Sequence, residues 1–249
     1  MTGSHRQTRT GLLQVIPWGR RVFWSYPKME TYLFIYYLVQ FCGHSWIFSN
    51  TIARFMSFGK DAFADTFYAM GYVMRLCQLL SALELLHILL GIEKRRFWPR
   101  FIQVTERLFI LFVVVASQEE VQGKYVVCVL FFLWNLWDVI RYTYIMLLSM
   151  EIEFPGLTWL NHNIWIPVYP VSVLAEAYAV YESLPYFETL GTYSFKMSFP
   201  YVGSIHFPYV LQMYLVMLPI EMYFLCSDLY AERKMHTSYS NFKKKEKAN

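Results

Sequence analysis

The sequence predicts an all-α integral membrane protein, a six-transmembrane-helix bundle with both termini in the cytosol. The prediction rests on composition, on six long apolar runs and on the distribution of basic residues. Of the 249 residues, 56% are hydrophobic and 16% are charged. Soluble domains carry about 25% charged residues, so this chain lacks the polar surface that a water-exposed body needs. The composition therefore favours a chain embedded in lipid.

Six apolar runs approach or exceed the roughly 20 residues that a membrane-spanning helix requires. They are residues 32–48, 66–91, 97–116, 125–147, 159–184 and 207–229. The third run is the weakest, because Arg100, Glu106 and Arg107 interrupt its first half. It can cross the membrane only if those charges face other helices. The runs divide the chain into an N-terminal segment (1–30), a membrane domain (31–230) and a basic tail (231–249).

Orientation follows from the Lys and Arg residues outside the runs, because cytosolic segments of membrane proteins are enriched in them. With the N-terminus in the cytosol, fifteen basic residues fall on the cytosolic side, counting Arg100 at the start of the third run, and four on the other. A five-span arrangement would move the six basic residues of the tail across the membrane and lose this bias. Lys245 and Lys247 form a dilysine pattern typical of retrieval to the endoplasmic reticulum, so we expect that membrane.

Ionisable residues occur inside the apolar runs, where each costs on the order of 2.5–3.5 kcal/mol on insertion scales. They are Arg75, Glu84, His87, Glu106, Arg107, Asp138, Arg141, Glu176 and Glu221. We expect them to face a shared polar interior. Helical spacing places Asp138 beside Arg141. It also places Glu84 beside His87, with Arg75 on a similar face. Any one such pair can equally be an ionic contact that only holds helices together.

The fifth run carries a tyrosine and a glutamate on one helical face. Tyr169 and Glu176 are seven residues apart, about two turns or 10.5 Å along an ideal helix. They are too far apart to hydrogen-bond unless Pro167 and Pro170 kink the helix. Alternatively, the two side chains bracket a substrate. Glu176 has no Lys or Arg in its own run to neutralise it, which favours a role beyond packing.

Several kinds of chemistry lack the residues that they need. A tyrosine-phosphatase loop requires Cys-x5-Arg, but none of the four cysteines has an arginine six residues further on. Those positions hold Phe48, Leu83, Trp134 and Glu232. Di-iron lipid enzymes need clustered histidines, whereas the six histidines here are scattered singly. A transporter would favour inverted repeats, which we do not find. Nucleic-acid binding is not expected, because the basic residues flank the spans.

Several segments resemble the very-long-chain (3R)-3-hydroxyacyl-CoA dehydratases, a family also labelled protein tyrosine phosphatase-like. They are residues 75–78, 83–87, 134–142 and 169–176. The resemblance extends over residues 32–233 and looks strongest to the fourth paralogue of the family through residues 32–37 and 41–46. It implies a six-helix enzyme of the endoplasmic reticulum that performs the third step of fatty-acid elongation. This step removes water from a (3R)-3-hydroxyacyl-CoA to give the trans-2-enoyl-CoA.

The resemblance also implies which residues act. The catalytic pair of the family corresponds to Tyr169 and Glu176, which would supply the acid and the base that elimination needs. The supporting polar cluster would comprise Arg75, Glu84, His87, Arg107, Asp138 and Arg141. Its arginines would orient the pair or stabilise charge on the thioester oxygen. No metal or organic cofactor is implied. The implied partners are the acyl-CoA substrate, fatty-acid elongases and enoyl-CoA reductases.

Three positions depart from the family pattern. Family members commonly carry Glu where this chain has Asp138, and Gly at the positions of Ser172 and Ala175. The added side chains on the helix of the catalytic pair keep a second interpretation open. In that interpretation the protein is a catalytically weak membrane scaffold or regulatory partner of elongation enzymes. Retention of both Tyr169 and Glu176 favours the enzyme.

Overall fold

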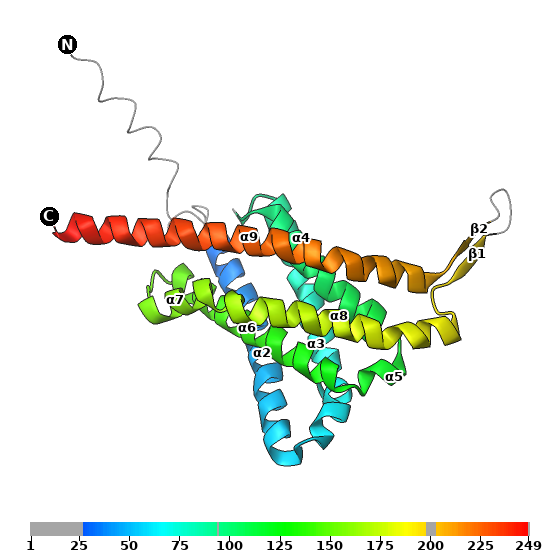
Figure 1. The fold of residues 1–249 in the computed structure, drawn as a ribbon. Coiled ribbons are helices and arrows are strands. Elements are labelled where there is room, and N and C mark those ends of the chain that lie inside the picture. Colours follow the sequence, from blue (N-terminus) through cyan, green and yellow to red (C-terminus); the bar gives the residue numbers. More distant parts are fainter. Residues whose placement is uncertain (1–26, 94, 198–202, 249) are drawn as a thin grey trace, which may run out of the picture.

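The protein is a bundle of long helices with one short β hairpin (Figure 1). Its structure, a computed structural model, describes residues 27–93, 95–197 and 203–248. The elements are α2 (Pro27–Phe58), α3 (Asp61–Leu89), α4 (Phe97–Leu108), the π-helix η1 (Phe109–Val115), α5 (Glu119–Gln122), α6 (Tyr125–Ser149), α7 (Pro155–Asn163), α8 (Trp165–Leu190), β1 (Phe195–Met197), β2 (Gly203–Ile205) and α9 (Phe207–Ala248). The hairpin is a departure from the all-α prediction, and it lies in the connector between the last two apolar runs.

The helical architecture agrees with the predicted class of membrane protein. In the described part of the chain, four helical segments are long and apolar enough to cross a membrane. They are Asp61–Leu89, Tyr125–Ser149, Pro155–Leu190 and Phe207–Ser238. The other two predicted spans are helical as well: one is α2, and the other is α4 together with the π-helix η1. The sequence and the fold therefore agree on an α-helical membrane protein.

The third predicted span is built from α4 and η1, which follow each other directly. The three charges that interrupt it, Arg100, Glu106 and Arg107, are all buried. Each contacts a group on another helix. The condition under which this segment can cross a membrane is therefore met.

The fifth predicted span, residues 159–184, lies within the candidate span Pro155–Leu190, although its helix is interrupted at one residue. It divides at Ile164 into α7 and α8. Pro167 is the third residue of α8, where the backbone N–H has no partner within the helix, so the proline is accommodated without loss of a hydrogen bond. The helix then continues across Pro170 to Leu190. Gly191 ends it with a φ of 64°, a left-handed conformation that glycine adopts easily.

Packing brings α8 to the centre of the site described below. Helix α2 packs against α3 and α6, and α8 packs against α6 and α9. The C-terminal end of α9 extends past the other helices (Figure 1). Most of the predicted tail 231–249 thus continues α9 as far as Ala248. The side chains of Lys245 and Lys247, and residues 1–26 of the predicted N-terminal segment, lie outside the described part of the chain.

Candidate active site

Tyr169 and Glu176 lie on one face of α8 and are both buried, with exposed fractions of 4% and 2%. Glu176 is near the middle of the helix, and Tyr169 is two turns closer to its N-terminus. No hydrogen bond joins the two side chains, although they are close enough to interact electrostatically. Because α8 is continuous across Pro170, Tyr169 and Glu176 remain two turns apart. This separation fits a pair of side chains that brackets a substrate.

Three other helices supply the groups that face this pair. From α6, the indole Nε1 of Trp134 donates a 2.8 Å hydrogen bond to Oε1 of Glu176. From α4, the buried carboxyl group of Glu106 lies close enough to that of Glu176 for the two to interact. From α9, Tyr214 and Glu221 interact electrostatically with the same groups. The site is therefore an interface of α4, α6, α8 and α9.

The site contains polar atoms that are buried and have no hydrogen-bond partner in the described part of the chain. They are Oη of Tyr169, Oε2 of Glu176, Oε1 of Glu106, Oη of Tyr214 and Oε2 of Glu221. Buried polar atoms in native proteins nearly always have a partner, so a group of unpaired oxygens requires an explanation. Donors and acceptors held free at one place can bind the polar atoms of a ligand. No three His, Cys, Asp or Glu residues of the described chain are arranged to hold a metal ion.

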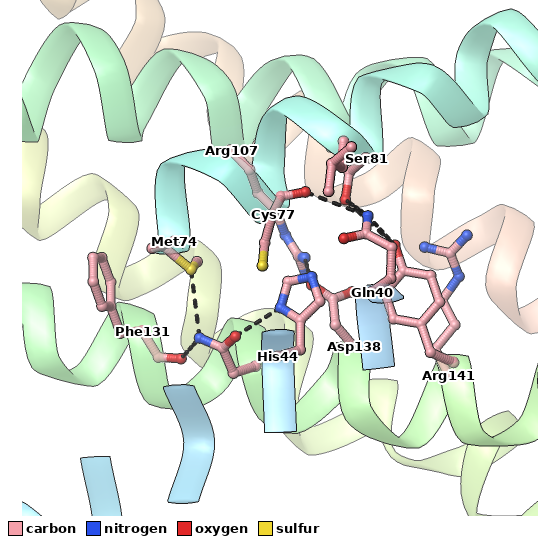
Figure 2. Close-up of polar contacts among 12 residues, drawn as sticks. Gln40, His44, Met74, Cys77, Ser81, Arg107, Phe131, Asp138 and Arg141 are labelled. Carbon is pink, nitrogen blue, oxygen red and sulfur yellow. Dashed lines mark hydrogen bonds and ion pairs between the residues drawn. The ribbon is translucent and has the colours of Figure 1, made fainter. Parts of the chain in front are cut away.

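Figure 2 shows a second group of polar residues, in which Arg107, Asp138 and His44 lie close together. NH1 of Arg107 donates to Oδ2 of Asp138 at 2.5 Å, and Nε2 of His44 lies 3.8 Å from the same oxygen. The guanidinium of Arg107 also lies over the ring of Trp134, 5.6 Å from its centre. The expected pairing of Asp138 with Arg141 inside α6 is therefore wrong. Asp138 pairs across the bundle with Arg107, and Arg107 in turn contacts the ring of Trp134.

A third group surrounds Glu84 of α3. Its carboxylate accepts hydrogen bonds from Arg141 at 2.5 Å, from Tyr142 at 2.5 Å and from Arg100 at 2.9 Å. His87 does not join this group and instead hydrogen-bonds to Tyr32 at 2.9 Å. Glu84 thus ties α3 to α4 and α6.

Arg75 stands apart from all three groups. Its Nε donates to the backbone carbonyl of Gly71, and its guanidinium lies 5.7 Å from the centre of the Phe67 ring. Within the described residues it forms no ion pair. The predicted supporting cluster is therefore divided among several places. Among the contacts of the described residues, Arg107 is the member that lies against Trp134, the residue bonded to Glu176, and Asp138 is linked to it through Arg107.

Sequence reasoning missed the partners that matter most at this site. Trp134 carries no charge, and the sequence predicts for Glu106 a place in a shared polar interior but no contact with Glu176. Tyr214 is one of 20 tyrosines in the chain and had no distinguishing mark. The usable signal was the seven-residue spacing of Tyr214 and Glu221 in the sixth run, which repeats the spacing of Tyr169 and Glu176.

The fold and the site define a multi-pass helical membrane protein that buries a tyrosine and several carboxyl groups between its helices. The family model described as "Protein tyrosine phosphatase-like protein, PTPLA" matches residues 78–239, and the chain belongs to this family. The resemblance predicted from sequence is confirmed. No solved structure matches the chain.

Curated relatives extend this result. A protein of Xenopus laevis named very-long-chain (3R)-3-hydroxyacyl-CoA dehydratase is 63% identical over 84% of this chain and 95% of its own length. The human very-long-chain (3R)-3-hydroxyacyl-CoA dehydratase 4 is 62% identical over 85% of this chain and 91% of its own length. Human dehydratase 3 is 39% identical over 86% of this chain and 59% of its own length. The likeness to the fourth paralogue is therefore confirmed too.

Proposed function

We propose that the protein is a membrane-embedded very-long-chain (3R)-3-hydroxyacyl-CoA dehydratase, a hydro-lyase of fatty-acid elongation, and that Tyr169 and Glu176 carry its proton transfers. One observation carries the assignment of the pair. Both residues are buried on one face of α8, and each presents an oxygen without a hydrogen-bond partner among the described residues. Relatives that are up to 63% identical carry the name of this dehydratase.

The reaction needs what the pair offers. A base removes a proton from the carbon next to the thioester carbonyl, and an acid protonates the hydroxyl group on the following carbon as its C–O bond breaks. The electron pair of the C–H bond becomes the new double bond, and water leaves. The two sites of proton transfer are on adjacent carbons, so one substrate fragment can lie between a tyrosine and a glutamate on the same helical face. We assign the two transfers to the pair as a unit.

The test is the conversion of a long-chain (3R)-3-hydroxyacyl-CoA to its trans-2-enoyl product by the purified protein in detergent. We expect Tyr169→Phe and Glu176→Gln to abolish conversion, with expression and thermal unfolding close to those of the unmodified protein. Tyr178→Phe and Glu182→Gln are matched controls, because these residues are hydrogen-bonded to each other on α8 away from the site. Full activity in the first two variants would exclude the pair.

The alternative function is a catalytically weak scaffold or regulatory partner of elongation enzymes. One observation favours it. Ser172 is buried on the face of α8 that carries the pair, and Ala175 packs against the main hydrophobic core. Both add atoms near the site where glycine would leave space. Absence of conversion over a range of chain lengths, with activity restored by Ser172→Gly and Ala175→Gly, would favour this alternative.

We further propose six spans with both termini in the cytosol. Helix α2 and the α4–η1 segment would be the two spans that join the four more apolar ones, and the bias of fifteen to four basic residues supports this orientation. Glycosylation acceptor sites can be inserted at the turn between α2 and α3 and in the connector before α6. Modification of these two sites, and not of one placed between α3 and α4, is expected. The reverse pattern would refute the orientation.

The same proposal places segments 1–30 and 231–249 in the cytosol, on either side of the membrane domain 31–230. It also places the protein in the endoplasmic reticulum, beside elongases and enoyl-CoA reductases that make its substrate and use its product. Colocalisation with a marker of that membrane, and crosslinking to an elongase or reductase in intact membranes, are the measurements. A location in another membrane would refute this part without affecting the chemistry.

A further inference from the structure

Glu176 lies where two hydrophobic clusters of the bundle meet. The first cluster is the main hydrophobic core, which includes Trp134 and Ala179. The second cluster includes Tyr169 and Val173. On α8, Val173 and Ala179 stand three residues before and three residues after Glu176, so Glu176 is at the boundary between the clusters. The indole of Trp134 reaches it from the first cluster through the hydrogen bond of 2.8 Å.

Tyr214 of α9 occupies the same boundary. Tyr214 and Leu215 are partly buried and pack against both clusters, and the tyrosine is the one of the two that carries a polar group. The ring of Tyr214 lies against that of Phe109 in η1, with ring centres 4.5 Å apart. Helix α9 also packs along α8, the helix of Tyr169 and Glu176. The phenol ring is therefore held between the helices at the level of the candidate site.

The hydroxyl group of Tyr214 is a donor held without a partner. Its Oη is buried and forms no hydrogen bond with any residue that the structure describes. A buried hydroxyl group without a partner lowers the stability of a fold, so its presence here requires an explanation. A free donor at the boundary that also contains Glu176 can bind an oxygen atom of a substrate.

The substrate has one polar atom near the reacting carbons that the proposed catalytic pair does not serve. The pair acts on the proton of one carbon and on the hydroxyl group of the next, which leaves the oxygen of the thioester carbonyl. Negative charge builds up on this oxygen as the neighbouring C–H bond breaks. Of the arginines that the sequence suggests for this role, Arg75 lies apart from the site, and Arg107 and Arg141 are paired with carboxylates.

We propose that the hydroxyl group of Tyr214 donates a hydrogen bond to the thioester oxygen of the bound acyl-CoA and stabilises the charge that develops there. The proposal deepens the dehydratase function and rests on it. Tyr214 keeps its proton throughout. The electron pair of the broken C–H bond is shared with the carbonyl oxygen in the transition state, and it forms the C=C bond as water leaves. Proton transfer remains with Tyr169 and Glu176.

The direct test is infrared difference spectroscopy of the full-length protein in detergent with bound trans-2-enoyl-CoA, isotopically labelled at the thioester carbonyl carbon. We expect the carbonyl band of the bound product at a lower frequency than that of the free product, because a hydrogen bond weakens the C=O bond. In Tyr214→Phe the band should return toward the free frequency, while the ring against Phe109 is kept. Tyr223→Phe is the matched control, because Tyr223 is on the same helix and is 71% exposed.

The enzymatic counterpart separates an effect on the reaction from an effect on the fold. Tyr214→Phe should lower kcat about 100-fold or more and change KM less, because the charge on the oxygen is largest in the transition state. Its thermal unfolding temperature should be equal to that of the unmodified protein or higher, because the variant removes a buried hydroxyl group that lacks a partner among the described residues. Tyr223→Phe should leave kcat unchanged.

An unshifted band in the unmodified protein would overturn the proposal, and so would an equal shift in Tyr214→Phe. A lower kcat together with a lower unfolding temperature and an unchanged band would show that Tyr214 only supports the fold, which would also overturn it. Failure of the dehydratase function has a different signature. An unmodified protein that converts no substrate, but whose bound product shows a shift that Tyr214→Phe removes, would refute that function and support the hydrogen bond.

Discussion

Trp134→Phe should lower the rate of dehydration without disturbing the fold. Trp134 is 1% exposed, and its Nε1 donates to Oε1 of Glu176 at 2.8 Å. Phenylalanine keeps an aromatic ring beneath the guanidinium of Arg107 but has no N–H group. Removal of a hydrogen bond to a charged group costs about 1.5–3 kcal/mol. Since about 1.4 kcal/mol corresponds to a tenfold change in rate, a loss of about 2 kcal/mol predicts a kcat about 30-fold lower.

The assay measures kcat and KM separately with a long-chain (3R)-3-hydroxyacyl-CoA. We expect KM to change little, because the indole acts on Glu176 and makes no contact that binding of the acyl chain would need. Trp165→Phe is the matched control. It loses an indole hydrogen bond to the carbonyl of His162 at 3.0 Å but leaves the partners of Glu176 in place. An unchanged kcat in Trp134→Phe, or an equal decrease in both variants, would refute the reasoning.

Three further predictions concern stability, measured as thermal unfolding in detergent. Asp138→Asn should destabilise the protein by about 3–5 kcal/mol, because Arg107 is left buried without its anion. The double variant Asp138→Leu with Arg107→Met should recover most of this loss. An equal loss of stability in the single and the double variant would contradict this prediction. Gly43→Ala should cost about 1–3 kcal/mol because the new Cβ would lie 2.5 Å from Sγ of Cys77, and Cys77→Ala in the same chain should relieve the clash. Glu84→Gln should lower the unfolding temperature more than Glu182→Gln does, since Glu84 is buried between two arginines. Similar unfolding temperatures for the two variants would show that the ion pairs of Glu84 do not stabilise the fold.

The sequence predicted the helices well because the spacing and length of apolar runs depend on the bilayer alone. All six predicted runs are helical in the structure. The prediction from sequence failed where the local backbone conformation determines the structure. The fifth run divides at Ile164, close to Pro167, and hydropathy averages such a break away. The hairpin of β1 and β2 lies in a connector too short to give a strand pattern.

The candidate site was predictable only in part. A seven-residue spacing places Tyr169 and Glu176 on one face of any regular helix, so that feature required no tertiary structure. The partners of Glu176 come from α4 and α6. The sequence of α8 does not indicate which residues of these other helices will face Glu176. The pairing of Asp138 with Arg141 failed for a related reason. Neighbours on one helix gain little from pairing, whereas a buried carboxylate is stabilised by whichever cation the packing brings to it.

In the mechanism that we propose, the position of Arg107 helps to keep Glu176 reactive. A guanidinium placed directly on Glu176 would turn it into half of an ion pair, and a carboxylate fixed in this way is a poor partner for proton transfer. Asp138 prevents this by binding Arg107 at 2.5 Å. The arginine lies over the ring of Trp134, which directs its N–H toward Glu176, and its charge also reaches Glu106 and Glu176. Arg107 and Asp138 thus balance each other, and Glu176, which forms no ion pair within the described residues, is the carboxyl group to which we assign the chemistry.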